Sequence, residues 1–452
     1  MIPNEKPLSP KLSRRFLSLS ILSLLTGAAT GLICTTFRFA LDWANRLRDA
    51  IILVERPDHL PGLAFFTALC AAAAALSAWL VRRFSIHATG SGIPHVEAVL
   101  HGLAPPTGLA LVPVKFVGGL LAMGAGLLLG REGPSVQMGA SISRWIGEKT
   151  GCGEEECREL LAAGAGAGLA TAFNAPIAGA IFVLEELVQR FEHRIAILAL
   201  GASASAIAIE RLLVGDRQEF HLVATIGAPT QSLWLFMILG LGLGLLAIFY
   251  NWTVLKSLKL VGGLRRLSVE TRAGIIGAGV ALVAWTAPGW IGGGEPIVQQ
   301  ALSDIGVFSG LFALLLVRLF LGALCYAAGT PGGVFAPMLA LGALSGQMFG
   351  RLCMNIAPDA VPHPGIFALV GMTALFSGVT RAPLTGIVLV TEMSGNASML
   401  LPMLCACFAA MLPPTLLGAI PLYESLRKIT LEREEEQQNR HQTLNKAEPA
   451  HE

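Results

Sequence analysis

Long apolar tracts alternate with short polar segments along most of the chain. We count about eleven such tracts between residues 16 and 418, and a helix needs about 20 apolar residues to cross the hydrocarbon core of a bilayer. The first tract, from about Phe16 to Thr36, is too long for the core of a signal peptide and predicts a first transmembrane helix. The pattern therefore predicts an all-α polytopic membrane protein.

Two of the apolar tracts are interrupted by a proline. Residues 160–173 and 177–189 are separated by Asn174-Ala175-Pro176, and residues 364–380 and 384–394 by Arg381-Ala382-Pro383. Each interrupted tract predicts two half-length helices. Inside lipid, broken helices persist only where protein or a water-filled cavity satisfies the freed backbone groups.

The two interrupted tracts also match each other, and Gly164 and Gly371 keep the same offset upstream of the breaks. Two halves with broken helices at matching positions are typical of transporters whose site lies at the repeat interface near the bilayer midplane. We therefore predict repeat halves at roughly residues 60–215 and 230–418. The identical pairs around the breaks are Ala175/Ala382, Pro176/Pro383, Gly179/Gly386, Val183/Val390 and Glu185/Glu392.

Composition narrows the class of protein. Of the 452 residues 54% are hydrophobic and only 14% charged, and the mean hydropathy is +0.64. An ordinary soluble enzyme needs more charge to cover its surface, and a net charge of +2 gives no reason to expect nucleic acid as a partner. The eight cysteines form no CxxC pair and are predicted to be small buried side chains. The nine histidines are scattered without metal-ligand spacing, so we expect no metal site and no cofactor.

Basic residues in short loops predict the topology, because they favour the cytoplasmic side of a membrane. We expect the polar N-terminal segment 1–15 and Arg82-Arg83 to be cytoplasmic. The tail 427–452 is polar and predicts a frayed or solvated cytoplasmic helix, with no second folded domain. The basic residues of a later loop should lie on the same side: Lys256, Lys259, Arg265 and Arg266.

Three segments rich in glycine and proline lie at the edges of apolar tracts: Gly90-Ser-Gly-Ile-Pro94, Gly130-Arg-Glu-Gly-Pro134 and Gly333-Val-Phe-Ala-Pro337. Proline is tolerated in the first turn of a helix, and glycine lets the backbone approach a ligand closely. Each segment therefore predicts a helix start, which carries about half a positive charge and binds anions. Three starts aimed at one point would hold an anion without a fixed cation; the alternative is three tight turns.

These three segments, the repeat and a late Pro421-Leu-Tyr423 resemble the CLC family of chloride channels and chloride/proton antiporters. The resemblance extends from about residue 16 to residue 426, and the order and spacing of the segments make it specific. It implies an all-α transmembrane domain of the bacterial exchanger type, with an inverted repeat of broken, tilted helices. It also implies a homodimer with a separate pore in each subunit.

The resemblance further implies two anion positions. A central anion would lie between the hydroxyls of Ser91 and Tyr423, and an outer one at the helix start around residue 132. Serine at position 91 is similar to the chloride-preferring form, and the intact second segment and the tyrosine are unlike the fluoride-exporting branch. The residues that would bind anions are Ser91, Gly92, Ile93, Arg131, Glu132, Gly133, the backbone N–H groups of Val334 and Phe335, and Tyr423.

Glu132 can also be interpreted physically. A carboxylate next to an anion site mimics an anion, so it occupies the site when ionised and leaves when protonated. One side chain would then link proton occupancy to anion occupancy, and by the resemblance Glu132 is the gate and external proton acceptor. The alternative is a salt bridge with Arg131, although adjacent residues on a helix do not face each other.

Glu185 and Glu186 follow an apolar run from Ala178 to Leu184. Ionisable residues in a transmembrane segment are costly and mark functional sites by default; the alternative is two carboxylates that reach cytoplasmic water at a helix end. By the resemblance, Glu186 is the internal proton-transfer residue, where passive channels of the family usually carry an apolar residue. Glu186 therefore favours an antiporter, and Glu185 is a possible member of the proton pathway.

Other charged residues leave alternatives open. Glu97 and Lys115 resemble family positions near the internal proton entry, and a structural ion pair is the alternative for both. We expect Arg318 and Glu392 to pair structurally. His95 departs from the acidic residue of well-known bacterial exchangers, which leaves the local proton entrance and the pH profile open because histidine titrates near neutrality.

We therefore expect a chloride/proton antiporter rather than an enzyme, in a bacterial inner membrane, with chloride, protons and lipid as partners. A passive chloride channel on the same scaffold is the first alternative. An intramembrane metal hydrolase using His95, Glu97, Glu185 and Glu186 is a remote one, because His95 and Glu97 would point to different helix faces and HExxH is absent. A sodium-coupled anion symporter is the last, since no residue singles out a sodium cage.

Overall fold

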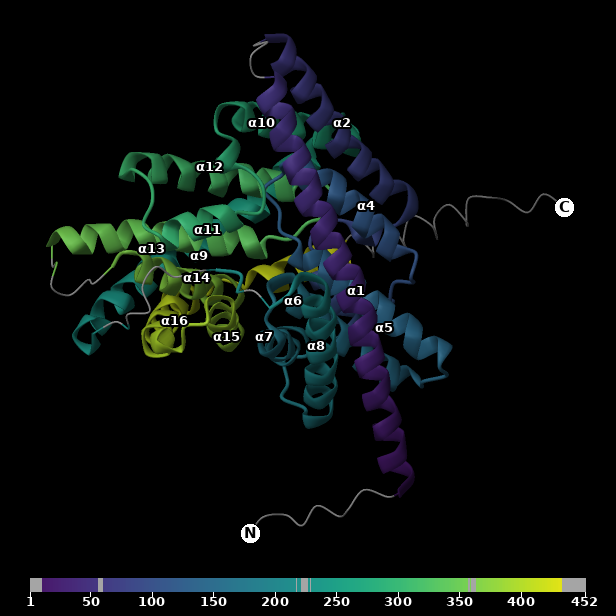
Figure 1. The fold of residues 1–452 in the computed structure, drawn as a ribbon. Helices are drawn as coiled ribbons and strands as arrows, with labels where there is room; N and C mark the ends of the chain where they lie inside the picture. Colours follow the sequence, from purple (N-terminus) through teal and green to yellow (C-terminus); the bar gives the residue numbers. More distant parts are fainter. Residues whose placement is uncertain are drawn as a thin grey trace.

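The structure, a computed structural model, describes residues 10–55, 60–216, 218–220, 227, 229–356, 358 and 363–432. The described chain is helical apart from turns and two isolated backbone bridges, so the predicted all-α fold is confirmed (Figure 1). Its α-helices are α1 (Pro10–Glu55), α2 (Leu60–Phe84), α3 (Ile93–Leu100), α4 (Leu111–Gly124), α5 (Glu132–Lys149), α6 (Glu154–Phe173), α7 (Pro176–Phe182), α8 (His193–Val214), α9 (Leu233–Gly263), α10 (Val269–Thr286), α11 (Glu295–Leu302), α12 (Phe308–Tyr326), α13 (Phe335–Ile356), α14 (Gly365–Thr380), α15 (Pro383–Ser394) and α16 (Leu400–Leu416), and residues 422–432 are also helical.

Among the described residues, six helical segments are long and apolar enough to cross a bilayer, and they contain α1, α2, α8, α9, α12 and α16. Their outward surfaces are apolar: Leu212 on α8 and Phe408 on α16, for example, are 81% and 60% exposed. Exposed apolar side chains on this scale suit lipid rather than water. The remaining helices are shorter or lie deeper, as expected for a chain with interrupted tracts.

The first helix is longer than the apolar tract that predicts it. α1 runs over 46 residues, which is about 69 Å of helix, whereas the predicted span covers residues 16–36. The helix continues because residues 37–55 contain neither glycine nor proline. Since a hydrocarbon core is about 30 Å thick, one end of α1 must extend beyond it.

Both predicted helix breaks are confirmed. α6 ends at Phe173 and α7 begins at Pro176, while α14 ends at Thr380 and α15 begins at Pro383. Asn174 and Arg381, the residues after the first helix of each pair, both adopt positive φ angles of 50° and 71°. A left-handed residue followed by Ala-Pro therefore ends one helix and starts the next in both tracts.

Helices pack in the same order in the two halves of the chain. α1 packs on α8 as α9 packs on α16, and α5 packs on α6 as α13 packs on α14. α6 contacts α7 and α8 as α14 contacts α15 and α16. α7 and α15 lie side by side between the two groups (Figure 1). The predicted residue limits of the halves stay a prediction, but each helix has its counterpart eight helices later.

The expected pairing of Arg318 with Glu392 is wrong. Arg318 is buried on α12, and its guanidinium donates to the carbonyls of Trp290 at 3.2 Å, Gly292 at 3.1 Å and Gly293 at 2.9 Å. Glu392 instead accepts backbone N–H groups at the start of α7. The cation therefore holds the turn before α11 through backbone carbonyls.

The structure describes the cysteines but only part of the termini. All eight cysteines are free; six are buried, and Cys152 and Cys405 are half-buried, as expected for small apolar side chains. The predicted cytoplasmic segment 1–15 lies outside the described residues up to residue 9, and the predicted tail 427–452 does so from residue 433.

Candidate functional site

The three glycine-led segments hold one another through their backbones. The Gly90 N–H donates to the Thr330 carbonyl, and the Gly332 N–H to the Gly90 carbonyl, both at 3.0 Å. Gly130 and Gly333 exchange two N–H···O bonds of 2.8 Å each. The starts of α3, α5 and α13 therefore meet, as three helix starts aimed at one anion require.

Ser91, Gly92 and Ile93 lead into α3. Gly92 is the N-cap with a φ of 82°, a conformation that glycine adopts without a Cβ penalty. Ser91 is only 1% exposed, and its hydroxyl has no hydrogen-bond partner among the described residues. A Cβ at Gly133 would lie 2.5 Å from the Ser91 Oγ, so glycine at 133 lets the start of α5 approach this hydroxyl.

The Glu132 carboxylate occupies the start of α13. Glu132 is fully buried, and its Oε1 accepts the N–H of Phe335 at 2.8 Å and that of Ala336 at 3.3 Å. Its Oε2 has no partner among the described residues. The N–H groups of Val334 and Phe335 were predicted as donors to the central anion, and this stays a prediction. In the structure Phe335 and Ala336 donate to the Glu132 carboxylate, and Ala336 was not among the predicted residues. The side chain thus stands where a helix start attracts an anion.

Tyr423 lies near both acidic residues of the predicted pathway. It is fully buried, and its hydroxyl has no hydrogen-bond partner among the described residues. It is close enough to Glu132 and to Glu186 to interact electrostatically with each. A buried hydroxyl without a partner is rare in folded proteins, so the hydroxyls of Tyr423 and Ser91 are free to donate to an anion.

Arg131 does not pair with Glu132, so the salt-bridge alternative is wrong. Its side chain is 8% exposed, and its guanidinium donates to Glu219 at 2.8 Å, approaches Glu295 at 3.3 Å and donates to the Ala172 carbonyl at 3.0 Å. The two neighbouring side chains point in different directions, as their helix positions require.

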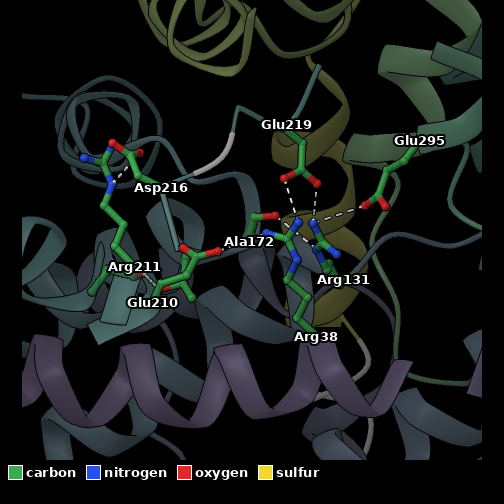
Figure 2. A network of polar contacts seen from close by, with 10 residues as sticks. Arg38, Arg131, Ala172, Glu210, Arg211, Asp216, Glu219 and Glu295 are labelled. Atoms are coloured by element: carbon green, nitrogen blue, oxygen red, sulfur yellow. Dashed lines mark hydrogen bonds and ion pairs between the residues drawn. The ribbon is translucent and has the colours of Figure 1, made fainter. Parts of the chain in front are cut away.

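Arg131 belongs to a larger set of ion pairs, which we call the Arg131 network: Arg38, Arg131, Glu210, Glu219 and Glu295. Arg38 donates to Glu210 at 2.9 Å and to Glu219 at 2.8 Å. Figure 2 shows the guanidinium groups of Arg38 and Arg131 meeting at the Glu219 carboxylate. The network connects α1, α5 and α8 with the chain at residue 219 and the start of α11.

Glu186 lies in a short π-helical turn, Val183–Leu187, that follows α7. It is 6% exposed and close enough to Glu97 and Glu185 for electrostatic interaction. π turns are rare and are often found at functional sites. Glu97 is 1% exposed and forms an ion pair with Arg427 and a hydrogen bond with Gln189 at 3.2 Å.

Lys115 and Glu97 do not pair with each other. The Lys115 ammonium is fully buried and donates to the carbonyls of Ala88 at 3.0 Å and Gly90 at 2.8 Å. Lys115 thus holds the turn before α3, as Arg318 holds the turn before α11. The arrangement places a buried amine behind the first glycine-led segment, where its acceptors among the described residues are backbone carbonyls.

Glu185 lies next to Glu186 but binds elsewhere. Its Oε1 accepts the Leu384 N–H at 3.0 Å, and its Oε2 accepts the Thr385 N–H at 2.6 Å and the Thr385 hydroxyl at 2.7 Å. All three donors lie at the start of α15. The two acidic neighbours therefore face different parts of the molecule.

His95 lines a cavity of about 380 Å³ that reaches the first glycine-led segment at Gly92. The His95 ring lies 4.7 Å from the ring of His87, and both rings line the cavity. Arg82 and Arg272 contribute positive charge to the same cavity. The cavity thus brings two histidines and two arginines near the start of α3, although Arg82 also pairs with Glu270.

Several residues of the site leave no local signal in the sequence. Arg38, Glu219 and Glu295 surround Arg131 from distant parts of the chain, and Arg427 reaches Glu97 across 330 positions. One further feature could have been found: Gly292-Gly-Gly-Glu-Pro296 starts α11 as Gly90-Ser-Gly-Ile-Pro94 starts α3, with a left-handed glycine N-cap and proline in the first turn of both.

The chain is similar to known membrane transport proteins over most of its length. A family model described as "Voltage gated chloride channel" matches residues 71–413. The proteins named H(+)/Cl(-) exchange transporter ClcA of Klebsiella pneumoniae (strain 342) and of Yersinia pestis are each 36% identical to it. The alignments cover 93% of this chain and 91% of the Klebsiella protein, and 92% of this chain and 88% of the Yersinia protein.

Solved structures agree with the fold. The crystal structure of a slow cyanobacterial Cl-/H+ antiporter superposes with a TM-score of 0.88 and 32% sequence identity, over 92% of this chain and 98% of that chain. A CLC-type fluoride/proton antiporter superposes with a TM-score of 0.75 at 22% identity, over 90% of this chain and 97% of that chain. At that lower identity the second comparison concerns the fold alone.

Proposed function

This chain belongs to the voltage-gated chloride channel (CLC) family, and we propose that it is a chloride/proton antiporter, as the similar exchangers are named. It is an integral membrane protein that moves chloride in one direction and protons in the other. The relatives that align with more than nine-tenths of this chain are named H(+)/Cl(-) exchange transporters. The presence of both Glu132 and Glu186 fits that activity.

The position of the Glu132 carboxylate is the observation that carries the mechanism. It accepts two N–H groups at the start of α13 and lies near Tyr423, while the next residue in the chain, Gly133, packs against Ser91, whose hydroxyl has no partner among the described residues. When a proton neutralises the carboxylate, its charge-assisted bonds to the helix start weaken, and chloride takes its place. When the proton leaves, the carboxylate returns and displaces chloride, so the two ions alternate.

The anion would rest on neutral donors. Ser91 and Tyr423 supply hydroxyls, and the starts of α3, α5 and α13 supply N–H groups and the positive ends of helix dipoles. Lys115 holds the first segment from behind without contacting the ion. Binding without a directly bound cation lets chloride leave again, which transport requires.

Protons would reach Glu132 from the other side by way of Glu186. Glu186 is buried and close enough to interact electrostatically with Glu97, which pairs with Arg427, and with Tyr423, which also interacts with Glu132. Internal protons would therefore follow a path past Glu97 to Glu186, while chloride would enter through the cavity lined by His87 and His95. The two ions would share only the region around Tyr423 and Glu132.

The setting of the protein is part of the proposal. We place it in a bacterial inner membrane as a homodimer, with both termini cytoplasmic. One cavity is lined by Arg82, Arg272 and residues 429–430. The C-terminal end of α2 and the start of α10 therefore lie on the same face as the C-terminal helix. The excess of basic residues on this face fits the cytoplasmic side.

A reconstituted flux assay tests the function. Purified protein in liposomes, given an outward chloride gradient, should drive protons inward against their own gradient, with external pH followed by electrode. Chloride flux without uphill proton movement would instead establish a passive channel, and absence of both fluxes would overturn the assignment to anion transport. Light scattering of crosslinked and uncrosslinked protein in detergent tests the homodimer.

A further inference from the structure

Glu185 and Glu392 occupy equivalent positions in the repeat and make reciprocal contacts. Glu185 binds the N–H groups of Leu384 and Thr385 at the start of α15. Glu392, on α15, binds the N–H groups at positions 177 and 178 at the start of α7, at 3.1 and 2.8 Å. The acid near the end of each helix caps the start of the other, so α7 and α15 run antiparallel about a local two-fold axis. We call this pair of contacts the glutamate clasp.

The two helices joined by the clasp end differently. α15 continues as a regular α-helix to Ser394, whereas α7 ends at Phe182 and is followed by the π turn Val183–Leu187. The Val188 N–H donates to the Val183 carbonyl at 2.8 Å, which is the i to i+5 bond of that turn. Both Glu185 and Glu186 lie inside it, while the equivalent of Glu186 in the second half is Met393.

We propose that Glu185 is a positioning residue for proton coupling: by binding the start of α15 it fixes the π turn that orients Glu186. The inference rests on the proposed antiport, in which Glu186 is the internal proton acceptor. It assigns Glu185 a role different from the proton pathway expected from the sequence. Glu392 caps α7 in the same way but orients no acidic neighbour.

Among the described residues, the donors to the Glu185 carboxylate all come from the start of α15. Both carboxylate oxygens already accept N–H or O–H groups, at distances from 2.6 to 3.0 Å. Of the roughly four lone-pair sites of a carboxylate, three are thus used by donors at the start of α15. The Thr385 hydroxyl is fully buried, and Glu185 is its acceptor. The contacts of Glu185 thus connect the π turn to the start of α15, and these contacts are what suit it to a positioning role.

Three variants test the role. Glu185→Gln removes the carboxylate and keeps the side-chain shape. Thr385→Val removes one donor and leaves the Glu185 carboxylate in place. Glu392→Gln is the matched control from the other half. Each is reconstituted, and chloride flux and the ratio of protons to chloride are measured beside the unmodified protein. Hydrogen exchange of the backbone amides 183–188, followed by mass spectrometry in detergent, reports on the π turn without any transport.

We expect Glu185→Gln to lower the proton-to-chloride ratio several-fold while chloride flux persists, and Thr385→Val to lower it partly. Both should speed exchange at residues 183–188, and Glu392→Gln should change neither the ratio nor that exchange. Loss of coupling in Glu185→Gln with normal coupling and exchange in Thr385→Val would assign Glu185 to proton transfer and overturn the proposal. Equal loss in Glu392→Gln would reduce the clasp to a general stabilising contact.

Failure of the antiport itself gives a different result. If the unmodified protein moves chloride but no protons, both the antiport proposal and the coupling role of Glu185 are overturned, because there is no proton-to-chloride ratio for the variants to change. The exchange measurement still reports whether Glu185 holds the π turn. Faster exchange in Glu185→Gln alone, with Glu392→Gln unchanged, would then establish the clasp as a conformational contact without proton coupling.

Discussion

Glu219 joins two buried arginines, and its substitution tests the Arg131 network. Glu219→Gln keeps one oxygen that can accept from Arg38 or Arg131, but it removes the negative charge between them. Both the Glu219 and the Arg131 side chains are only 8% exposed, so the substitution leaves a buried charge poorly compensated. Removing one partner from a buried ion pair costs about 3–5 kcal/mol.

The remaining contacts decide where in that range the loss should fall. Arg38 keeps Glu210 at 2.9 Å, and Arg131 keeps the Ala172 carbonyl at 3.0 Å and Glu295 at 3.3 Å. Because both cations retain partners, we expect a loss near the lower limit, about 3 kcal/mol in the free energy of unfolding. The change should also slow transport, since Arg131 precedes the gating residue in the chain.

Asp216→Asn is the matched control, because Asp216 pairs with Arg211 only 3.4 Å away, yet their side chains are 75% and 47% exposed. An exposed pair contributes about 0–1 kcal/mol. Unfolding of both variants is followed by titration with a denaturing detergent in mixed micelles, and a double-mutant cycle with Arg38→Gln isolates the coupling. Equal losses in Glu219→Gln and Asp216→Asn, below about 1 kcal/mol, would refute the reasoning from burial.

Three further substitutions address the gate and the proton path. Glu132→Ala should abolish proton movement while chloride flux persists, because the carboxylate that alternates with chloride is gone; a pH electrode that still records uphill proton uptake would contradict the gate assignment. Glu186→Gln should uncouple protons but leave chloride binding intact by isothermal titration calorimetry, and unchanged coupling would mean that protons enter elsewhere. Gly333→Ala would place a Cβ against the Glu132 carboxylate. We expect it to displace the carboxylate from the start of α13 and to lower the proton-to-chloride ratio several-fold in the same flux assay. Gly310→Ala is the control, because a Cβ there has no atom within 4 Å.

Much of the architecture could be predicted from the sequence because its signals are local. Proline after Asn174-Ala and Arg381-Ala marks both helix breaks, and the glycine-proline segments mark three helix starts. The repeat then makes the two breaks equivalent. Hydrophobicity alone, however, placed the end of the first helix some 19 residues too early, because a helix continues through polar residues until a stop signal such as glycine or proline ends it.

The partners of the charged residues could not be predicted, because they come from distant parts of the chain or from the backbone. Glu219 is 88 positions from Arg131. Arg318 and Lys115 bind carbonyl groups, which every residue carries and which therefore leave no mark in the sequence. The expected Arg318–Glu392 pair failed for this reason: opposite charges were matched where main-chain groups already satisfied both.

The glutamate clasp has a consequence for how such a chain could have arisen. Each half leaves the N–H groups at the start of its second broken helix to an acid from the other half. Without the other half these N–H groups would lose their acceptors, and an unsatisfied backbone group facing lipid costs several kcal/mol. Because the contacts are reciprocal, two copies of one half inserted in opposite directions could make the same contacts with each other.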